Sequence, residues 1–89
     1  MPTATKGQAQ PVDFAGLILG FSSAALYYMG EGAIDGKPGQ KNLPLAKQNI
    51  DIIDLLKDKT KGNLSADERD LIEQLTADLH LKFVDVAKR

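Results

Sequence analysis

The residues that could support catalysis or bind a metal begin with three acidic side chains in the middle of the chain. Asp51, Asp54 and Asp58 recur at about one helical turn and would place three carboxylates near one face of a helix. Such a face could hold a cation or supply a general acid and base. Lysines stand one turn from these acids along the same stretch, which is typical of ion pairs on a solvated surface. We therefore interpret the acidic face as solvent-exposed and expect no metal there.

His80 is the second candidate, since it is the one histidine of the chain. It lacks the Glu-x-x-His pattern of di-metal helical bundles, and no serine stands where it could form a relay with this ring. The chain has no cysteine, which excludes disulfides, thiol catalysis and zinc–thiolate sites. We therefore expect no enzyme activity, no cofactor and no metal site.

A basic turn offers a third kind of chemistry, the binding of an anion. Lys59, Lys61, Gly62 and Asn63 stand close together between two predicted helices. In the structural interpretation, Gly62 takes a left-handed conformation after the helix end, and the lysines complement the helix dipole. In the functional interpretation, the same residues form a small anion site. The alternative function is therefore a small-ligand or anion-binding protein that uses this turn.

Length and composition limit the classes of protein to which this chain can belong. The chain has 89 residues, of which 43% are hydrophobic and 26% charged, and this is ordinary for one globular domain. Its 11 basic and 12 acidic residues give a net charge of −1, which does not favour nucleic-acid binding. We expect residues 1–12 to be a flexible N-terminal tail, residues 13–89 to be a single helical domain, and the protein to be cytoplasmic.

The element that would position everything else is an apolar stretch, FAGLILGFSSAALYYM, at Phe14–Met29. Its helical periodicity predicts a core face formed by Phe14, Leu17, Ile18, Phe21, Ala25, Tyr28 and Met29. The opposite side carries Gly16, Gly20, Ser23 and Tyr27. Small residues four apart leave a groove in which another backbone can approach closely. The run is shorter than the ~20 apolar residues of a spanning helix, so we expect no membrane span.

Two further helices follow. Gly30–Asn42 is rich in glycine and predicts a loop, and a second helix is expected from Leu43 or Pro44 to Thr60. Ser65 and Glu68 form a predicted capping box for a third helix that runs from Ala66 to Val86 or beyond. The second half of that helix has another apolar set on its far side: Ala77, Leu81 and Val84.

Asn49 interrupts the apolar face of the second helix. A buried amide must find hydrogen-bond partners. It could form a local hydrogen bond inside the bundle, or it could fix the register and copy number of an assembly. The sequence leaves both possibilities open.

Together these patterns predict an all-α fold, a three-helix protomer with helix 1 central that assembles as a helical-bundle homodimer. A chain this short buries only about 60–65% of its unfolded surface, and association is a common remedy. The most consistent function is a non-enzymatic, self-associating interaction module with a possible further protein partner. The residues predicted to form the oligomer interface are Gly16, Gly20, Ser23, Tyr27, Leu81 and Val84.

Several stretches also carry a resemblance to a known family. They are ALYYMGE at residues 25–31, LPLAKQNID at 43–51, KTKGNL at 59–64 and DLHLKFV at 78–84. From about Phe14 onward the chain resembles a family of short bacterial proteins called the domain of unknown function number 1844. The resemblance implies a bacterial, compact, mainly helical module, and it supplies no activity.

Overall fold

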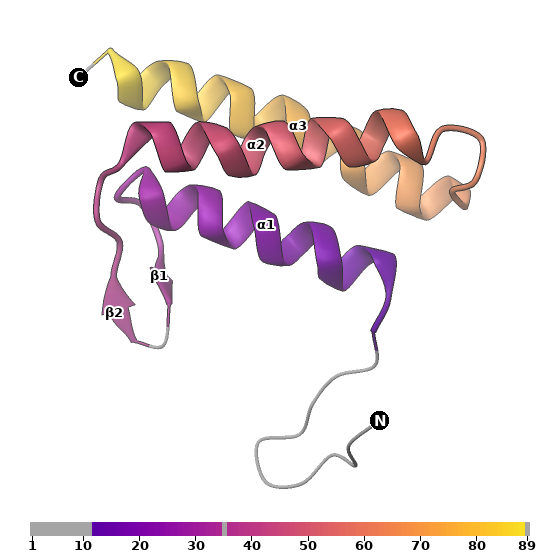
Figure 1. Ribbon diagram of the computed structural model, residues 1–89, viewed down its shortest axis with the longest axis horizontal. Helices are drawn as coiled ribbons and strands as arrows, with labels where there is room; N and C mark the ends of the chain where they lie inside the picture. The colour runs from indigo at the N-terminus through magenta and orange to yellow at the C-terminus, as the bar shows by residue number, and fades with distance from the viewer. Residues whose placement is uncertain (1–11, 35, 89) are drawn as a thin grey trace, which may run out of the picture.

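The computed structural model describes residues 12–34 and 36–88, which form a bundle of helices with a small hairpin at one end (Figure 1). The elements in chain order are α1 (Phe14–Tyr28), β1 (Ala33–Ile34), β2 (Lys37–Pro38), α2 (Leu43–Lys59) and α3 (Ala66–Ala87). The three predicted helices are confirmed, to within a residue or two at each end. Of the predicted N-terminal tail, residues 1–11 lie outside the described part of the chain.

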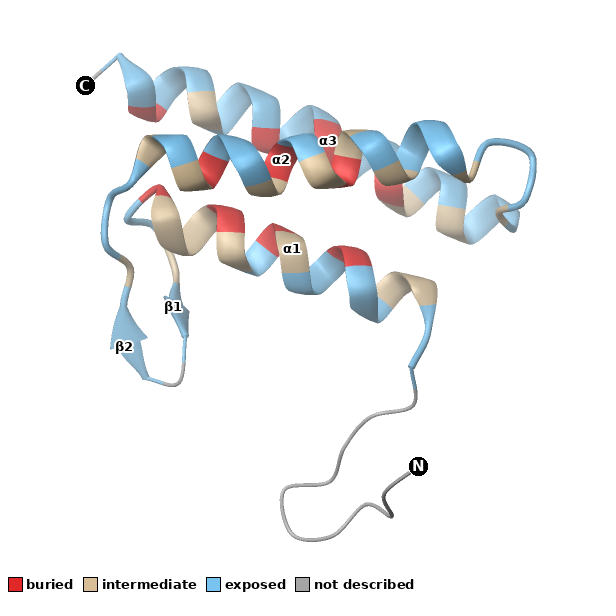
Figure 2. Cartoon of the chain, viewed as in Figure 1, coloured by how far each residue is buried: buried red, intermediate tan, exposed pale blue. Residues whose placement is uncertain are grey.

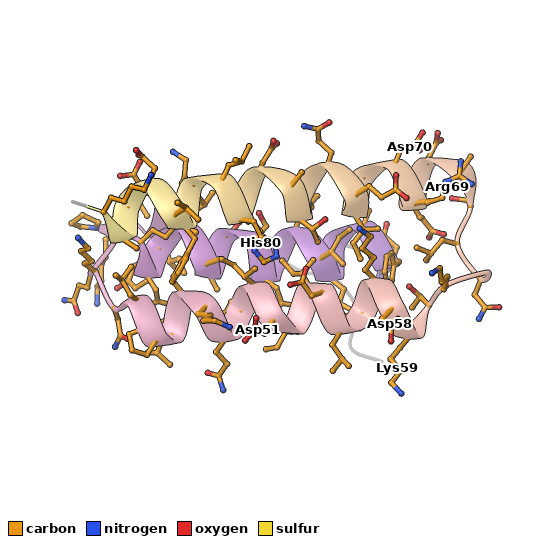
Figure 3. All side chains as sticks on the ribbon, turned by 90° about the horizontal axis from the view of Figure 1, so that it is seen from above. Asp51, Asp58, Lys59, Arg69, Asp70 and His80 are labelled. Carbon is orange, nitrogen blue, oxygen red and sulfur yellow. The ribbon has the colours of Figure 1, made fainter. Side chains whose placement is uncertain are left out.

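The helices run alternately in opposite directions, and in cross-section they lie at the corners of a triangle. Figure 1 shows α1 beside α2, and the view from above in Figure 3 shows α1 beneath the gap between α2 and α3. Each helix contacts the other two, and α1 packs more extensively against α2 than against α3. The sequence predicts a central first helix. In the protomer, α1 contacts both other helices but lies at one corner of the triangle. The side of α1 that faces away from α2 and α3, its outward side, is therefore uncovered.

The start of each helix is fixed by a side-chain cap. The backbone N–H of Gly16 donates to Asp13 Oδ1 over 2.7 Å, and that of Leu45 donates to Asn42 Oδ1 over 3.1 Å. Ser65 and Glu68 form the predicted capping box, with donor–acceptor distances of 3.1 and 2.9 Å. Caps of this kind satisfy N–H groups that have no partner within the helix.

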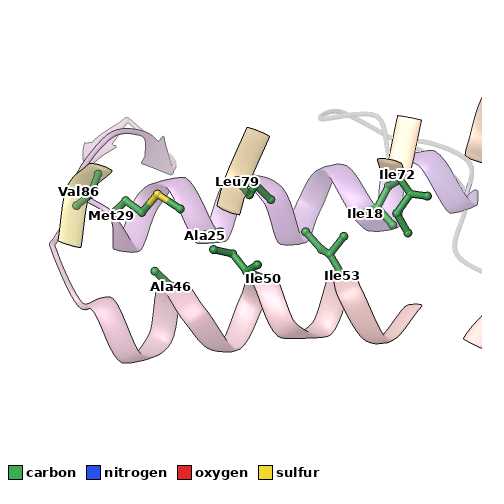
Figure 4. Packing of buried hydrophobic residues seen from close by; sticks show 9 residues of the cluster. All are labelled: Ile18, Ala25, Met29, Ala46, Ile50, Ile53, Ile72, Leu79 and Val86. Carbon is green, nitrogen blue, oxygen red and sulfur yellow. The ribbon is translucent and has the colours of Figure 1, made fainter. Parts of the chain in front are cut away.

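The apolar core is built in three layers, and each layer takes one buried residue from α1 or its C-cap, one from α2 and one from α3 (Figure 4). These layers are Met29–Ala46–Val86, Ala25–Ile50–Leu79 and Ile18–Ile53–Ile72. All nine side chains are at most 3% exposed, and in Figure 2 they form the buried strip between the helices. Because each layer draws on all three helices, no pair of helices can bury its apolar residues without the third.

One core prediction for helix 1 is wrong, and one buried residue was not predicted. Leu17, expected in the core, is 46% exposed, whereas Ser22 is only 6% exposed. Two neighbouring helices can cover only part of the circumference of α1, and Leu17 falls beyond the edge of that covered part. Ser22 is small enough to sit inside it.

The segment Gly30–Asn42 departs from the predicted loop, because it contains an antiparallel hairpin. Ala33 pairs with Pro38 and Ile34 with Lys37. The hairpin follows a helix end in which Gly30, at φ +82°, lets the N–H groups of Gly30 and Glu31 donate to Tyr27 and Leu26 carbonyl oxygens. It then folds back on α1, since a Cβ atom at Gly39 would overlap the carbonyl oxygen of Tyr27.

The layered core makes a direct prediction for Ile53, which is fully buried. We expect Ile53→Ala to lower the free energy of unfolding by about 2–5 kcal/mol, because it removes apolar contacts and leaves a cavity. Leu55→Ala is the matched control, since Leu55 lies on the same helix but is 55% exposed. Urea denaturation followed by circular dichroism measures both. Equal losses for the two variants would contradict the assignment of the core.

Candidate functional site

The outward side of α1 is an uncharged surface that the protomer leaves exposed. No residue from Phe14 to Tyr28 carries a charge. Gly16, Gly20 and Ser23 are exposed along this side, and Leu17 and Leu19 are each 46% exposed. Figure 2 shows exposed segments of α1 on its side away from α2 and α3. A helix that is apolar all round is normally surrounded by protein, and α1 is not.

A shallow groove runs along one edge of this side, where α1 meets α2. It is lined by Gly16, Leu17, Gly20, Phe21, Ala24 and Asn49. Asn49 is partly buried, and its Nδ2 donates to the backbone oxygen of Leu45 over 2.9 Å. This is the local hydrogen bond that the sequence leaves open as one possibility. The side chain nevertheless also faces the groove, as a polar residue at its edge.

The two glycines of the predicted groove have different local surroundings. A Cβ atom at Gly16 would lie 2.9 Å from Asp13 Oδ1, so the absence of a side chain there lets the carboxylate cap the helix. A Cβ atom at Gly20 would meet no heavy atom within 4 Å. Glycine inside a helix is about 1 kcal/mol less favourable than alanine. Packing in the protomer therefore accounts for Gly16 but gives no reason for Gly20.

The other predicted interface residues lie elsewhere. Leu81 and Val84 are 73% and 51% exposed on the outward side of α3, opposite the buried Leu79 and Val86. They therefore face a different direction from Gly20. Tyr27 is partly buried at the end of α1, where its ring stands edge-on to that of Tyr28, with 5.2 Å between ring centres. The fold does not bring the six predicted residues onto one surface.

The four residues of the predicted anion site do not all line one surface either. Lys61 and Gly62 line a hollow beside the α2–α3 turn, but Lys59 and Asn63 do not. Lys59 points away from α3 in Figure 3. Gly62 has φ +87°, so the predicted left-handed conformation is confirmed. Two cations that sequence reasoning missed line the hollow: Lys57, one turn before Lys61, and Arg69, in the first turns of α3.

One residue of the acidic face, Asp54 on α2, contacts His80 on α3. His80 Nε2 lies 2.8 Å from Asp54 Oδ2, and both side chains are partly exposed (Figure 3). Asp51 is paired instead with Lys47, at 3.0 Å. No group of three or more histidine, cysteine, aspartate or glutamate residues in the described chain is arranged to hold a metal ion. The Asp54–His80 pair was not expected, because residues 26 apart give no signal in local spacing.

Comparison with known proteins identifies the family of this chain. A family model described as a domain of unknown function (DUF1844) matches residues 11–85. The chain belongs to the DUF1844 family. The resemblance found in the sequence is thereby confirmed. No curated protein and no solved structure matched the chain.

The DUF1844 match takes in α1, the hairpin, α2 and α3 as far as Asp85. The outward side of α1 and the hollow at the α2–α3 turn therefore both belong to the DUF1844 region. None of the helices described for this DUF1844 chain is long and apolar enough to cross a membrane.

The contrast between the two glycines predicts different effects of the same substitution. We expect Gly20→Ala to stabilise the dissociated protomer by about 1 kcal/mol, because helix propensity improves and the new methyl group meets open space. Gly16→Ala should gain less, because its methyl group would displace the Asp13 cap. Urea unfolding at sub-micromolar concentration compares them. An equal gain at both positions would show that the cap does not constrain Gly16.

Proposed function

We propose that this protein is a non-enzymatic interaction module that forms a homodimer through the outward side of α1. The observation on which the proposal rests is Gly20. This glycine lies in the interior of α1, and the protomer leaves it in open space on a surface that carries no charge and is partly apolar. A second helix lying across this position would need the room that the missing side chain leaves. We further place the protein in the bacterial cytoplasm, which suits a chain without cysteine.

A second copy of the chain suits this surface for two reasons. Two copies can bring their α1 helices together without burying any charge, because neither helix has one. Gly20 also lies near the middle of α1, so two antiparallel helices that cross there would present the same residues to each other. A two-fold contact requires this self-complementarity.

The outward side of α1 is too small to form a standard dimer interface alone. The 15 residues of α1 span about 22 Å at 1.5 Å per residue. A standard interface buries roughly 800 Å² per partner, which is more than one side of such a helix provides. We therefore include in the interface the groove beside Leu17 and Phe21, with Asn49 of α2 at its edge. The partner's helix would cover Leu17 and Leu19, the most exposed leucines of α1.

The first test places a charge at the centre of the proposed interface. We expect the wild-type protein to sediment as a dimer at micromolar concentration and Gly20→Glu to raise the dissociation constant at least tenfold, because a buried carboxylate would have no partner. Gln48→Glu adds the same charge at an exposed position of α2 and should leave the dissociation constant unchanged. Sedimentation equilibrium measures all three. A wild-type monomer, or an unaffected Gly20→Glu dimer, would refute the proposal.

The second test asks whether the assembly is two-fold or head-to-tail. The proposed interface leaves Leu81 of α3 uncovered, so Leu81→Lys should change the dissociation constant less than twofold. If α1 of one copy instead packed on α3 of the next, Leu81→Lys would abolish association and the wild type would form open chains. Size-exclusion chromatography with light scattering distinguishes these outcomes.

A further inference from the structure

A partly enclosed hollow lies where the end of α2, the following turn and the start of α3 meet. Its volume is about 330 Å³, at the lower end of the range for small-molecule sites. It is lined by Lys57, Lys61, Gly62, Leu64, Arg69, Ile72 and Glu73. The hollow receives no residue from α1, so it is independent of the proposed dimer.

Basic residues outnumber acidic residues among the described residues that line this hollow. Lys57 and Lys61 are one turn apart and make no ion pair among residues 12–34 and 36–88. Among the same described residues, the only ion-pair partner of Arg69 is its neighbour Asp70, at 3.8 Å. The three cations and the Glu73 carboxylate leave the lining with a net charge of +2.

Carboxylates nearby do not remove this excess from the hollow itself. Asp54 and Asp58 line a second, more open depression together with the same two lysines, Lys57 and Lys61. Asp54 is already engaged, because His80 Nε2 lies 2.8 Å from its Oδ2. The view in Figure 3 places His80 near the middle of the bundle and Arg69 at the end that carries the turn. Among the described residues that line the hollow itself, the acidic one is Glu73 of α3, and none comes from α2.

The floor of the hollow is apolar. Leu64 is partly buried and keeps some surface accessible, and beneath it lies Ile72, a fully buried core residue. A ligand that only carried charge would leave this floor in contact with water. A ligand with a short apolar body would cover it and still place an acid group at the rim, which is the usual arrangement of small-molecule sites.

We propose that this hollow binds a small organic phosphate monoester. The phosphate carries close to two negative charges at pH 7, which matches the net charge of the lining. Arg69 offers the planar pair of donors that binds phosphate oxygens bidentately, and Lys57 and Lys61 add point charges. The apolar body of the ligand lies on Leu64, above the fully buried Ile72, and Glu73 accepts a hydrogen bond from a ligand hydroxyl or amine group. Lys59, although in the same basic run, takes no part.

Phenyl phosphate is a suitable probe, since it combines a dianionic phosphate with a compact apolar ring. Titration followed by amide chemical shifts should place the affected residues around Lys57, Gly62, Leu64 and Arg69. Inorganic phosphate should bind at least fivefold more weakly because it leaves the floor uncovered, benzoate should bind more weakly because it has one charge, and phenol should not bind. Benzoate binding as tight as that of phenyl phosphate would overturn the charge match.

Matched variants decide whether the hollow is the site. Lys61→Gln and Arg69→Gln should each weaken phenyl phosphate binding at least tenfold. Lys59→Gln removes a lysine two residues before Lys61, at the end of α2 but outside the hollow, and should change binding less than twofold. The altered side chains are exposed, so the variants should keep the wild-type unfolding curve. Shift changes located elsewhere, no saturation at 10 mM probe, or an equal loss in Lys59→Gln would overturn the proposal.

Discussion

The three-layer core, in which α1 or its C-cap, α2 and α3 each contribute one buried residue per layer, holds the protomer together. Because every layer needs all three helices, the positions of the other features follow from it. It turns the Ile18, Ala25 and Met29 side of α1 inward and leaves Gly20 on the opposite side. It also sets α2 and α3 side by side, so that Asp54 meets His80 and Lys57 approaches the start of α3.

The same packing gives the protomer two surfaces of opposite chemistry. The outward side of α1 has no charge, whereas the outer seam between α2 and α3 is lined by acids, lysines, Arg69 and His80. An uncharged helix surface favours contact with another apolar surface. A seam with unpaired cations favours an anion. The ion pair of Lys82 with Glu31, at 3.2 Å, links α3 to the segment that follows α1 and lies outside both surfaces.

Local signals in the sequence predicted the helices and their ends well. The caps at Asp13 and Ser65 involve residues only three apart, so spacing alone reveals them. The hairpin was missed because its strands have two residues each, too few for any periodicity. The Asp-Gly pair between Ile34 and Lys37 is a hairpin signal that could have indicated it. For the candidate sites, the sequence identified Gly20, Lys61 and Gly62 but missed Lys57 and Arg69.

By itself, the sequence determined which residues form helices, where those helices start and which sides are apolar, because these properties depend on neighbours within one or two turns. Tertiary structure alone decided how much of each apolar side is covered. Leu17 is exposed and Ser22 buried because two helices cover only part of α1. It also separated Leu81 from Gly20 and brought Arg69 beside Lys57, since the direction in which one helix faces another is fixed by the shared core and not by local spacing.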